Sequence, residues 1–396
     1  MRTSISLSGI ELCRVPTTYF LKCISRGIIQ LMQLTIGIDA SRAVKKNRTG
    51  PENYSYEIIR AILNLRTDHR FILYAPHRPN EDFPTGSNID WRILPQQRLW
   101  SQFRLAKEVG GSPPDVLFVP SHVVPLITHL PTVVTIHDLA FKYFPYSYSA
   151  FERRYQNFST GVSVAKATRV IVPSQATLND LIKFYPAAKP KTKIIAHGYD
   201  KELFKPAKGD GQSPQNDPYI LYVGRIEEKK NVRLLLDAFS LLCKEKKKIN
   251  LVLGGRNGYG FEAIQTKIKE LPQEIRHRIS QPGHLPRYDM IRYLQHATIF
   301  AFPSSYEGFG LSVLEALACG VPVVCSDNSS LPEVTGQAAI LLPPSNPLSW
   351  ASAFGRILNS PELATKLHLA SIKQAERFSW QTAAEETLEV ITNAAG

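Results

Sequence analysis

Apolar residues recur along this chain in two alternating patterns. Short runs of β-branched and other apolar residues, bounded by turn-forming residues, predict strands, and longer stretches with apolar residues every three or four positions predict amphipathic helices. The strands are expected at 34–39, 71–75, 116–119, 133–136, 169–172, 219–223, 250–254, 298–302 and 322–325. The helices are expected at 52–65, 148–166, 174–184, 230–245, 286–296, 310–319 and 361–376. This alternation predicts parallel sheets with helices on both faces.

One segment interrupts the alternation. The stretch KPAKGDGQSPQNDP at 205–218 is rich in Pro, Gly, Asn and Asp, which is typical of a linker, and a fresh strand, YILYVGR, follows it. We therefore predict an α/β fold with two doubly wound, Rossmann-like domains that face each other across a cleft. The predicted boundaries are 32–205 and 218–375, with a linker at 206–217. Ligands of such sheets bind beyond the carboxyl ends of the strands, so the cleft is the expected binding site.

Composition places the chain among globular proteins. It has 396 residues, 43% of them hydrophobic and 20% charged, and this length suggests two domains of ordinary size. No apolar run approaches the ~20 residues that a transmembrane helix needs. The five cysteines show neither CxxC nor Cys/His spacing, so we expect a reduced, cytoplasmic setting in which they are small buried side chains: Cys13, Cys23, Cys243, Cys319 and Cys325.

The first 31 residues differ from the rest. They carry four basic residues against a single acid, and a methionine at position 32 precedes the first strand directly. Our favoured interpretation is an upstream start codon chosen in error, and the alternative is an amphipathic segment that lies on a membrane surface. A signal peptide is not favoured, because no apolar core is followed by a small-residue cleavage site.

Positive charge is concentrated in the first half. Residues 1–200 hold 25 Lys and Arg against 14 Asp and Glu, whereas residues 201–396 hold 22 against 20. This imbalance serves solubility alone, or it attracts an anionic membrane face or a lipid-linked substrate, in which case peripheral contact through the first domain is expected. Nucleic acid is not an expected partner, because no basic-aromatic motif or recognition helix is present.

The stretch PSSYEGFGLSVLEALACGVPVV at 303–324 carries the first candidate chemistry. Gly308 and Gly310 let the backbone approach a ligand, and the helix that they open offers unpaired N–H groups to an anion. Glu307 precedes the turn, and Glu315 lies on an otherwise apolar helix, where burial should require hydroxyl or amide partners. A phosphate flanked by two hydroxyl acceptors suits a nucleotide diphosphate sugar. Taken alone, the pair is better explained by a surface cap at Glu307 and a structural carboxylate at Glu315.

A second stretch, ILYVGRIEEKKNVRLLLDAF at 220–239, again predicts a strand, a glycine turn and a helix. Arg225 and Lys230 flank the start of that helix, where a guanidinium fork and an ammonium group suit phosphate oxygens. A solvated charged surface is the alternative explanation.

Together these stretches resemble the retaining GT-B glycosyltransferases of family 4, and mannosyltransferase-like members in particular. The family's E-x7-E matches Glu307 and Glu315, and its VGR…KN matches residues 223–225 and 230–231. GVPVV (320–324), LPEV (331–334), VPSQATLNDLIKFY (172–185) and KIIAHGYDKELFKP (193–206) look like further phrases of that family. The resemblance extends from about residue 34 to the C-terminus. It implies a GT-B fold in which the C-terminal helix, within 376–396, packs back on the first domain.

The resemblance assigns roles to individual residues. Those implied for donor binding are Gly50, Arg225, Lys230, Gly308, Phe309, Gly310, Leu311 and Glu315. His137 and Glu307 are implied as catalytic, and His122 and Asp138 are candidates on the acceptor side, in the first domain. Two departures stand out: TGPENY replaces a glycine-richer loop after Gly50, and Ser329-Ser330 stand where the family commonly has two glycines.

The expected function is transfer of a hexose, of mannose or glucose type, from a GDP- or UDP-linked sugar to a saccharide or lipid-linked saccharide, as in polysaccharide and cell-envelope biosynthesis. Retention of configuration is implied by the resemblance alone. No D-x-D occurs in the chain, so we expect no metal and no other cofactor. The resemblance also implies a front-face route, in which the leaving phosphate would accept the acceptor's proton while His137 positions the sugar and Glu307 holds its hydroxyls. An NDP-sugar epimerase or hydrolase, or a non-catalytic sugar-nucleotide binding protein, are the alternatives.

Overall fold

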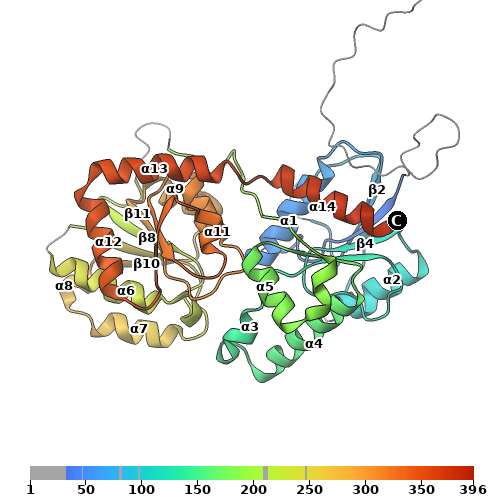
Figure 1. The fold of residues 1–396 in the computed structure, drawn as a ribbon, viewed down its shortest axis with the longest axis horizontal. Coiled ribbons are helices and arrows are strands. Elements are labelled where there is room, and N and C mark those ends of the chain that lie inside the picture. Colours follow the sequence, from blue (N-terminus) through green and yellow to red (C-terminus); the bar gives the residue numbers. More distant parts are fainter. Residues whose placement is uncertain (1–32, 47, 80–82, 97–98, 208–212, 246–247) are drawn as a thin grey trace, which may run out of the picture. The chain divides into compact units, whose positions relative to one another are not determined.

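The computed structural model describes residues 33–396 except 47, 80–82, 97–98, 208–212 and 246–247. The predicted N-terminal extension, with Cys13 and Cys23, and the middle of the predicted linker lie outside the described residues. Residues 34–396 form one compact unit with two β-sheets. We call β1 to β7 with their helices the first lobe and β8 to β13 with theirs the second lobe (Figure 1).

The first lobe is built on a seven-stranded parallel sheet with strand order β3-β2-β1-β4-β5-β6-β7. Its strands are β1 (Thr35–Asp39), β2 (Arg70–Ala75), β3 (Ile89–Ile93), β4 (Val116–Val119), β5 (Thr132–Thr135), β6 (Arg169–Val172) and β7 (Thr192–Ile194). Its helices are α1 (Gly50–Leu63), α2 (Ala106–Gly111), α3 (Ala140–Tyr143), α4 (Ala150–Lys166) and α5 (Gln175–Phe184).

The second lobe is built on a six-stranded parallel sheet with strand order β10-β9-β8-β11-β12-β13. Its strands are β8 (Tyr219–Val223), β9 (Asn250–Gly254), β10 (Ile279–Gly283), β11 (Ile299–Phe302), β12 (Val323–Ser326) and β13 (Ala339–Leu342). Its helices are α6 (Val232–Lys244), α7 (Phe261–Glu270), α8 (Gln273–Arg276), α9 (Arg287–His296), α10 (Leu311–Ala318), α11 (Leu331–Thr335), α12 (Pro347–Asn359) and α13 (Pro361–Ala375).

The predicted α/β class with two parallel, Rossmann-like sheets is confirmed. All nine predicted strands are present, and the four that the pattern missed, β3, β7, β10 and β13, are the four edge strands. β13 was missed although its sequence AILL is a continuous apolar run. The other three edge strands mix polar and apolar residues, as strands that are only partly covered can. The sequence ISQPG of β10 and the half-buried IDWRI of β3 show this directly.

The last helix, α14 (Trp380–Ala395), belongs to the core of the first lobe although it ends the chain. It lies beside α1 (Figure 1), and Leu388 and Ile391 join Ile36 and Ile59 in one buried cluster. Burying each such side chain stabilises the fold by about 1.5–3 kcal/mol. The chain therefore passes from the first lobe to the second and returns to complete the first.

The cysteines and the helix lengths can be compared with what the sequence predicted. The described cysteines are free, and Cys319 and Cys325 are buried. Among the helices that the structure describes, none combines the length and apolar character needed to cross a bilayer.

Strand order places a ligand-binding position in each sheet. The direction of strand succession reverses between β1 and β4 in the first sheet and between β8 and β11 in the second. In open α/β sheets ligands bind outside the carboxyl ends of the strands at such a reversal. The loop after β8 contains Arg225, and the loop after β11 contains Glu307, so both residues lie at the reversal of the second sheet.

Candidate functional site

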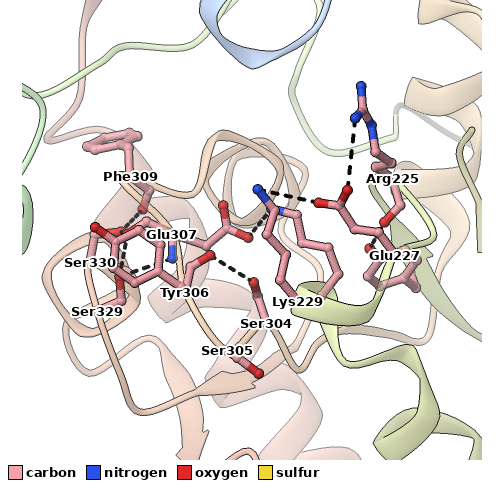
Figure 2. Close-up of polar contacts among 12 residues, drawn as sticks. Arg225, Glu227, Lys229, Ser304, Ser305, Tyr306, Glu307, Phe309, Ser329 and Ser330 are labelled. Carbon is pink, nitrogen blue, oxygen red and sulfur yellow. Dashed lines mark hydrogen bonds and ion pairs between the residues drawn. The ribbon is translucent and has the colours of Figure 1, made fainter. Parts of the chain in front are cut away.

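Charged side chains gather at the reversal of the second sheet (Figure 2). Glu227 is 8% exposed and lies between Arg225, at 3.9 Å, and Lys229, at 3.4 Å. The Arg225 side chain is 54% exposed, so its guanidinium remains open to solvent. Burial alone would lower the pKa of Lys229, but the negative charges of Asp138 and Glu227 outweigh it and raise that pKa. The result is a set of fixed positive charges at the strand ends.

Lys230 and Glu307 form an ion pair at the centre of this set. Their side chains are only 15% and 13% exposed, so each is largely removed from water yet keeps an open side. The Lys230 ammonium also lies 5.6 Å from the centre of the Phe302 ring. A buried pair of this kind is held in one geometry. Either residue can exchange its partner for a ligand group that carries the same charge as that partner.

Two serines fix the backbone of Glu307. The backbone N–H of Glu307 donates to Ser329 Oγ at 3.0 Å, and the hydroxyls of Ser329 and Ser330 both reach the Glu307 carbonyl. Ser330 Oγ also lies 2.7 Å from the carbonyl of Phe309. Ser329 has φ of 56°, in the left-handed region that favours glycine. The glycine common here in the family suits this backbone, and serine adds hydrogen bonds that offset its conformational cost.

The Gly-Phe-Gly turn leads into α10. Gly310 has φ of 111°, and a Cβ there would lie 2.8 Å from Leu331 Cδ2, so glycine is required. A Cβ on Gly308 would lie 1.9 Å from the carbonyl oxygen of His137. Phe309 is buried against His197, with ring centres 4.5 Å apart, so its side chain anchors the turn. Leu311 begins α10 and packs against the cores of both lobes.

Glu315 lies in the second turn of α10. Burial raises its pKa to about 8; Arg287 counteracts this and Glu57 adds to it. Hydroxyl or amide partners were expected, yet among the described residues none lies within hydrogen-bonding distance of its carboxyl group. Its oxygens are therefore available to hydroxyl donors from outside the protein.

His137 follows β5 in the first lobe and is 6% exposed. Its Nε2 lies 3.0 Å from the carbonyl oxygen of Pro120, so this nitrogen carries the proton and donates it. Tyr54 packs edge-on against the ring at 4.7 Å. Burial, with a smaller contribution from His122, lowers the pKa of His137 to about 3. The ring is therefore neutral near pH 7, and Nδ1 is its acceptor.

The two acceptor-side candidates are engaged within the protein. His122 Nε2 accepts the backbone N–H of His137 at 3.1 Å, so His122 supports the catalytic candidate. Asp138 Oδ1 accepts the N–H of Ala140 at the start of α3. Burial alone would raise the pKa of Asp138, but Lys229 and His122 lower it.

Gly50 begins α1, and nothing lies within 4 Å of where its Cβ would be. The departure from the family's loop has a structural consequence two residues later. The Glu52 carboxylate accepts from Arg42 at 3.0 Å and from Lys45 at 3.1 Å and bonds Thr49. Burial alone would raise the pKa of Glu52, but these partners lower it to about 2. A carboxylate of the protein thus accompanies the positive end of this helix.

Several polar residues near the sites had no local sequence signal. Arg287 lies 3.1 Å from Glu57 and 3.2 Å from Asp200, and Glu57 is 230 positions away in the chain. Glu333, of the LPEV stretch, accepts the N–H groups of Gln175 and Ala176 at the start of α5. Such pairs are invisible to motif spacing because the fold alone joins them. Within the part of the chain that the structure describes, no three His, Cys, Asp or Glu side chains gather as metal ligands do.

Comparison with known proteins agrees with this architecture. The family model "Glycosyltransferase Family 4" matches residues 48–203, and "Glycosyl transferases group 1" matches residues 204–374. The O-antigen chain mannosyltransferase B of Escherichia coli is 30% identical over 390 residues, which cover 89% of this chain and 98% of that protein.

Solved structures share the fold at lower sequence identity. Sucrose-phosphate synthase of Thermosynechococcus elongatus superposes with a TM-score of 0.73 at 19% identity, covering 91% of this chain and 99% of its own. HepE of Anabaena, solved in complex with UDP-glucose, superposes with a TM-score of 0.69 at 18% identity, covering 91% and 100%. The chain therefore belongs to the glycosyl transferases group 1 family and is a glycosyltransferase of the GT-B fold.

Proposed function

We propose that this glycosyltransferase moves mannose from a nucleotide diphosphate sugar to a saccharide or lipid-linked saccharide, with retention of configuration and without a metal ion. The observation that carries the proposal is the Lys230–Glu307 pair at the strand reversal of the second sheet, beside the open Arg225 guanidinium. The mannose assignment rests on the similarity to the O-antigen chain mannosyltransferase, which spans nearly the whole of both chains.

The diphosphate would lie between the cations and the start of α10. Arg225 and Lys230 supply charge-assisted hydrogen bonds, and the first N–H groups of α10 point to the same strand ends. These groups take the place that a divalent cation has on the diphosphate in other transferases. Glu315, which has no partner among the described residues, would accept the ribose hydroxyls.

Donor binding would divide the Lys230–Glu307 pair between two ends of one ligand. Lys230 turns to the phosphate, and Glu307 is left to accept hydroxyls of the transferred sugar. The serines that hold the Glu307 backbone keep its side chain aimed during this exchange. His137, neutral and fixed through Pro120, would present Nδ1 to a sugar hydroxyl and position the sugar. The leaving phosphate would accept the proton of the attacking hydroxyl, so the protein need supply no general base.

Donor turnover tests this proposal. Purified protein would be incubated in EDTA with GDP-mannose, UDP-glucose, UDP-N-acetylglucosamine or UDP-galactose, with and without saccharide acceptors, and free nucleotide would be measured. We expect release from GDP-mannose alone. Release only after Mg²⁺ is added would overturn the proposed phosphate site, and release from a UDP-sugar alone would overturn the mannose assignment.

The same experiment separates the competing functions. An epimerase would convert the sugar without releasing nucleotide, and a hydrolase would release nucleotide at a rate that acceptors do not change. A non-catalytic binding protein would bind the nucleotide and release nothing from any donor with any acceptor. Each of these results would overturn the proposal that the Lys230–Glu307 site catalyses sugar transfer.

A further inference from the structure

Tyr306 directly precedes Glu307 in the loop after β11, and it is only 8% exposed (Figure 2). Its hydroxyl bonds to the first lobe at two points. It donates to Asp180 Oδ2 at 2.7 Å and accepts the backbone N–H of Leu139 at 3.2 Å. Burial raises the pKa of Tyr306, and Asp138 and Asp180 add to this, so the hydroxyl keeps the proton that it donates. A buried hydroxyl with both a donor and an acceptor bond is held in one position.

Both ends of this contact lie next to a residue with a proposed role in transfer. Leu139 comes two positions after His137, and Tyr306 comes one position before Glu307. Consecutive Cα atoms lie about 3.8 Å apart, so an anchored backbone leaves little room for a side chain one or two positions away to shift. The Tyr306 hydroxyl therefore joins the segment that carries Glu307 to the segment that carries His137.

The residue on the other side of Glu307 also bonds to the first lobe. The carbonyl of Gly308 accepts from Ser174 Oγ at 2.7 Å and from Thr177 Oγ1 at 3.0 Å, at the start of α5. Asp180 lies on the same helix, three positions after Thr177. Helix α5 thus contacts the turn after β11 both before and after Glu307.

Glu333 provides another contact between α5 and the second lobe. Its carboxylate accepts the N–H groups of Gln175 and Ala176 at 2.7 and 2.8 Å. The first N–H groups of a helix have no partner within the helix, and a carboxylate at that end is favourable. Because of this contact and those to Gly308, α5 keeps bonds to the second lobe when the Tyr306 hydroxyl is removed. A variant that lacks the hydroxyl therefore tests alignment rather than the meeting of the lobes.

We propose that Tyr306 and Asp180 are positioning residues whose hydrogen bond aligns Glu307 of the second lobe with His137 of the first. In the proposed function one transferred sugar meets both of these side chains, and they come from different lobes. A displacement of about 1 Å between groups that act on one substrate can lower a rate by about a hundredfold. The inference rests on the proposed roles of Glu307 and His137, and its test includes variants of both.

Tyr306→Phe removes the hydroxyl and keeps the ring. Tyr143→Phe is the matched control: the Tyr143 hydroxyl also donates to Asp180, at Oδ1, but α3 and α5 both belong to the first lobe. The control therefore removes the same group from the same acceptor without a change between the lobes. Asp180→Ala removes the acceptor itself. This residue is half-buried, so the variant tests the same bond even where Tyr306→Phe does not fold.

Turnover would be measured with the donor from which the wild type releases nucleotide, which we expect to be GDP-mannose, and affinity by calorimetric titration of its free nucleotide. We expect Tyr306→Phe and Asp180→Ala each to lower kcat by about tenfold or more and to leave nucleotide affinity within about twofold. The two changes together should lower kcat no further than either alone, because they remove one bond. Tyr143→Phe should stay within about twofold of the wild type in kcat.

A kcat of Tyr306→Phe equal to that of Tyr143→Phe would overturn the proposal, and an equal loss of unfolding temperature in the two variants would then make the hydroxyl structural alone. Losses in kcat that add in the double variant would also overturn it. So would a fall in nucleotide affinity equal to the fall in kcat, which would assign Tyr306 to donor binding.

Glu307→Gln and His137→Ala, measured in parallel, separate this inference from the proposed function. If either keeps the transfer rate of the wild type, the proposed function fails and the alignment has no purpose. If both lose transfer while Tyr306→Phe and Asp180→Ala keep it, the proposed function stands and the positioning of Glu307 by Tyr306 is wrong.

Discussion

The two sheets present polar residues at their carboxyl ends in different ways. In the second lobe, charged side chains pair with one another, as in Lys230–Glu307 and Glu227–Lys229. In the first lobe, the side chains that follow β5 bond to backbone groups, as His137 does to Pro120 and Asp138 to Ala140. A side chain paired with another charge can exchange it for a ligand charge, whereas one tied to the backbone stays in place. The second lobe is therefore suited to bind an anionic donor, and the first to position a neutral sugar.

Removing Arg225 and Lys230, the two cations proposed to bind the diphosphate, should have the largest effect. Hydrogen bonds to charged groups contribute roughly 1.5–3 kcal/mol each, so Arg225→Ala with Lys230→Ala should lower kcat/KM by roughly two to four powers of ten. Nucleotide affinity should fall with it. Lys267→Ala is the control, because this lysine also forms an ion pair in the second lobe but on α7, away from the strand reversal. A double variant as active as that control would mean that the diphosphate binds elsewhere.

His137→Ala tests the first lobe and should have the next largest effect. Loss of a positioning group should lower the transfer rate by at least about a hundredfold and leave nucleotide affinity unchanged. Burial holds the pKa of His137 to about 3, so this residue should add no limb to the pH–rate profile between about pH 5 and pH 9. His129→Ala, at an exposed histidine of the same lobe, is the control. A fall in nucleotide affinity equal to the fall in rate would place His137 in donor binding and remove the contrast between the lobes.

Glu315 tests the comparison of the two lobes in another way. Unlike Lys230, Glu307, Glu227 and Lys229, it forms no ion pair with a described residue of the second lobe. Its pKa is raised from 4.5 to about 8. Between these pH values the folded protein keeps the Glu315 proton, whereas the unfolded chain releases it. The stability from this difference is present below about pH 4.5 and is lost as pH rises through about 8. Glu315→Gln should thus unfold at a higher temperature than the wild type at pH 9 and at a similar one at pH 4.5.

The same substitution should also change nucleotide binding. If the ionised carboxylate accepts ribose hydroxyls, the affinity of the wild type rises between about pH 6 and pH 9, and that of Glu315→Gln does not. Calorimetric titration at several pH values would measure both. A wild-type affinity independent of pH would assign Glu315 to structure alone.

Ser330→Ala should have the smallest effect. It removes a buried hydroxyl that lies within hydrogen-bonding distance of the carbonyls of Glu307 and Phe309. We expect a loss of about 1–2 kcal/mol in the free energy of unfolding and a few-fold change in rate. Chemical denaturation and donor turnover would measure the two. A loss of rate as large as that of the cation variant would show that the position of Glu307 depends on this hydroxyl more than on its ion pair.

The sequence predicted local features of the fold well and long-range contacts poorly. The strands at the centre of both sheets, the glycine turns and the positions of Arg225 and Glu307 at strand ends are local patterns, and the fold confirms them. The edge strands β3, β7 and β10 escaped prediction because each mixes polar and apolar residues, as a strand with an unpaired edge can. β13 escaped although its sequence AILL is a continuous apolar run. The Arg287–Glu57 pair escaped because its members come from helices far apart in the chain.

The sequence did not reveal what several candidate side chains contact. Phe309 was expected at the donor; its ring is buried against His197 and its carbonyl accepts from Ser330, so a donor contact through this residue stays a prediction. His122 was expected on the acceptor side, which stays a prediction; in the structure its Nε2 accepts the backbone N–H of His137. Ser329 was seen as a departure from glycine, and the structure shows a left-handed backbone that serine tolerates through its bonds to Glu307. In each case the residue type indicated a place in the sequence, and packing decided what the side chain contacts.

The central claim is that Lys230 and Glu307 serve two ends of one donor. The most direct test is calorimetric titration of GDP, in EDTA, into the wild type and Glu307→Gln, together with transfer measurements on both. The account predicts that Glu307→Gln loses transfer but binds GDP at least as tightly as the wild type, because Lys230 no longer has an internal carboxylate as its partner. A folded Glu307→Gln protein that no longer binds GDP would contradict it.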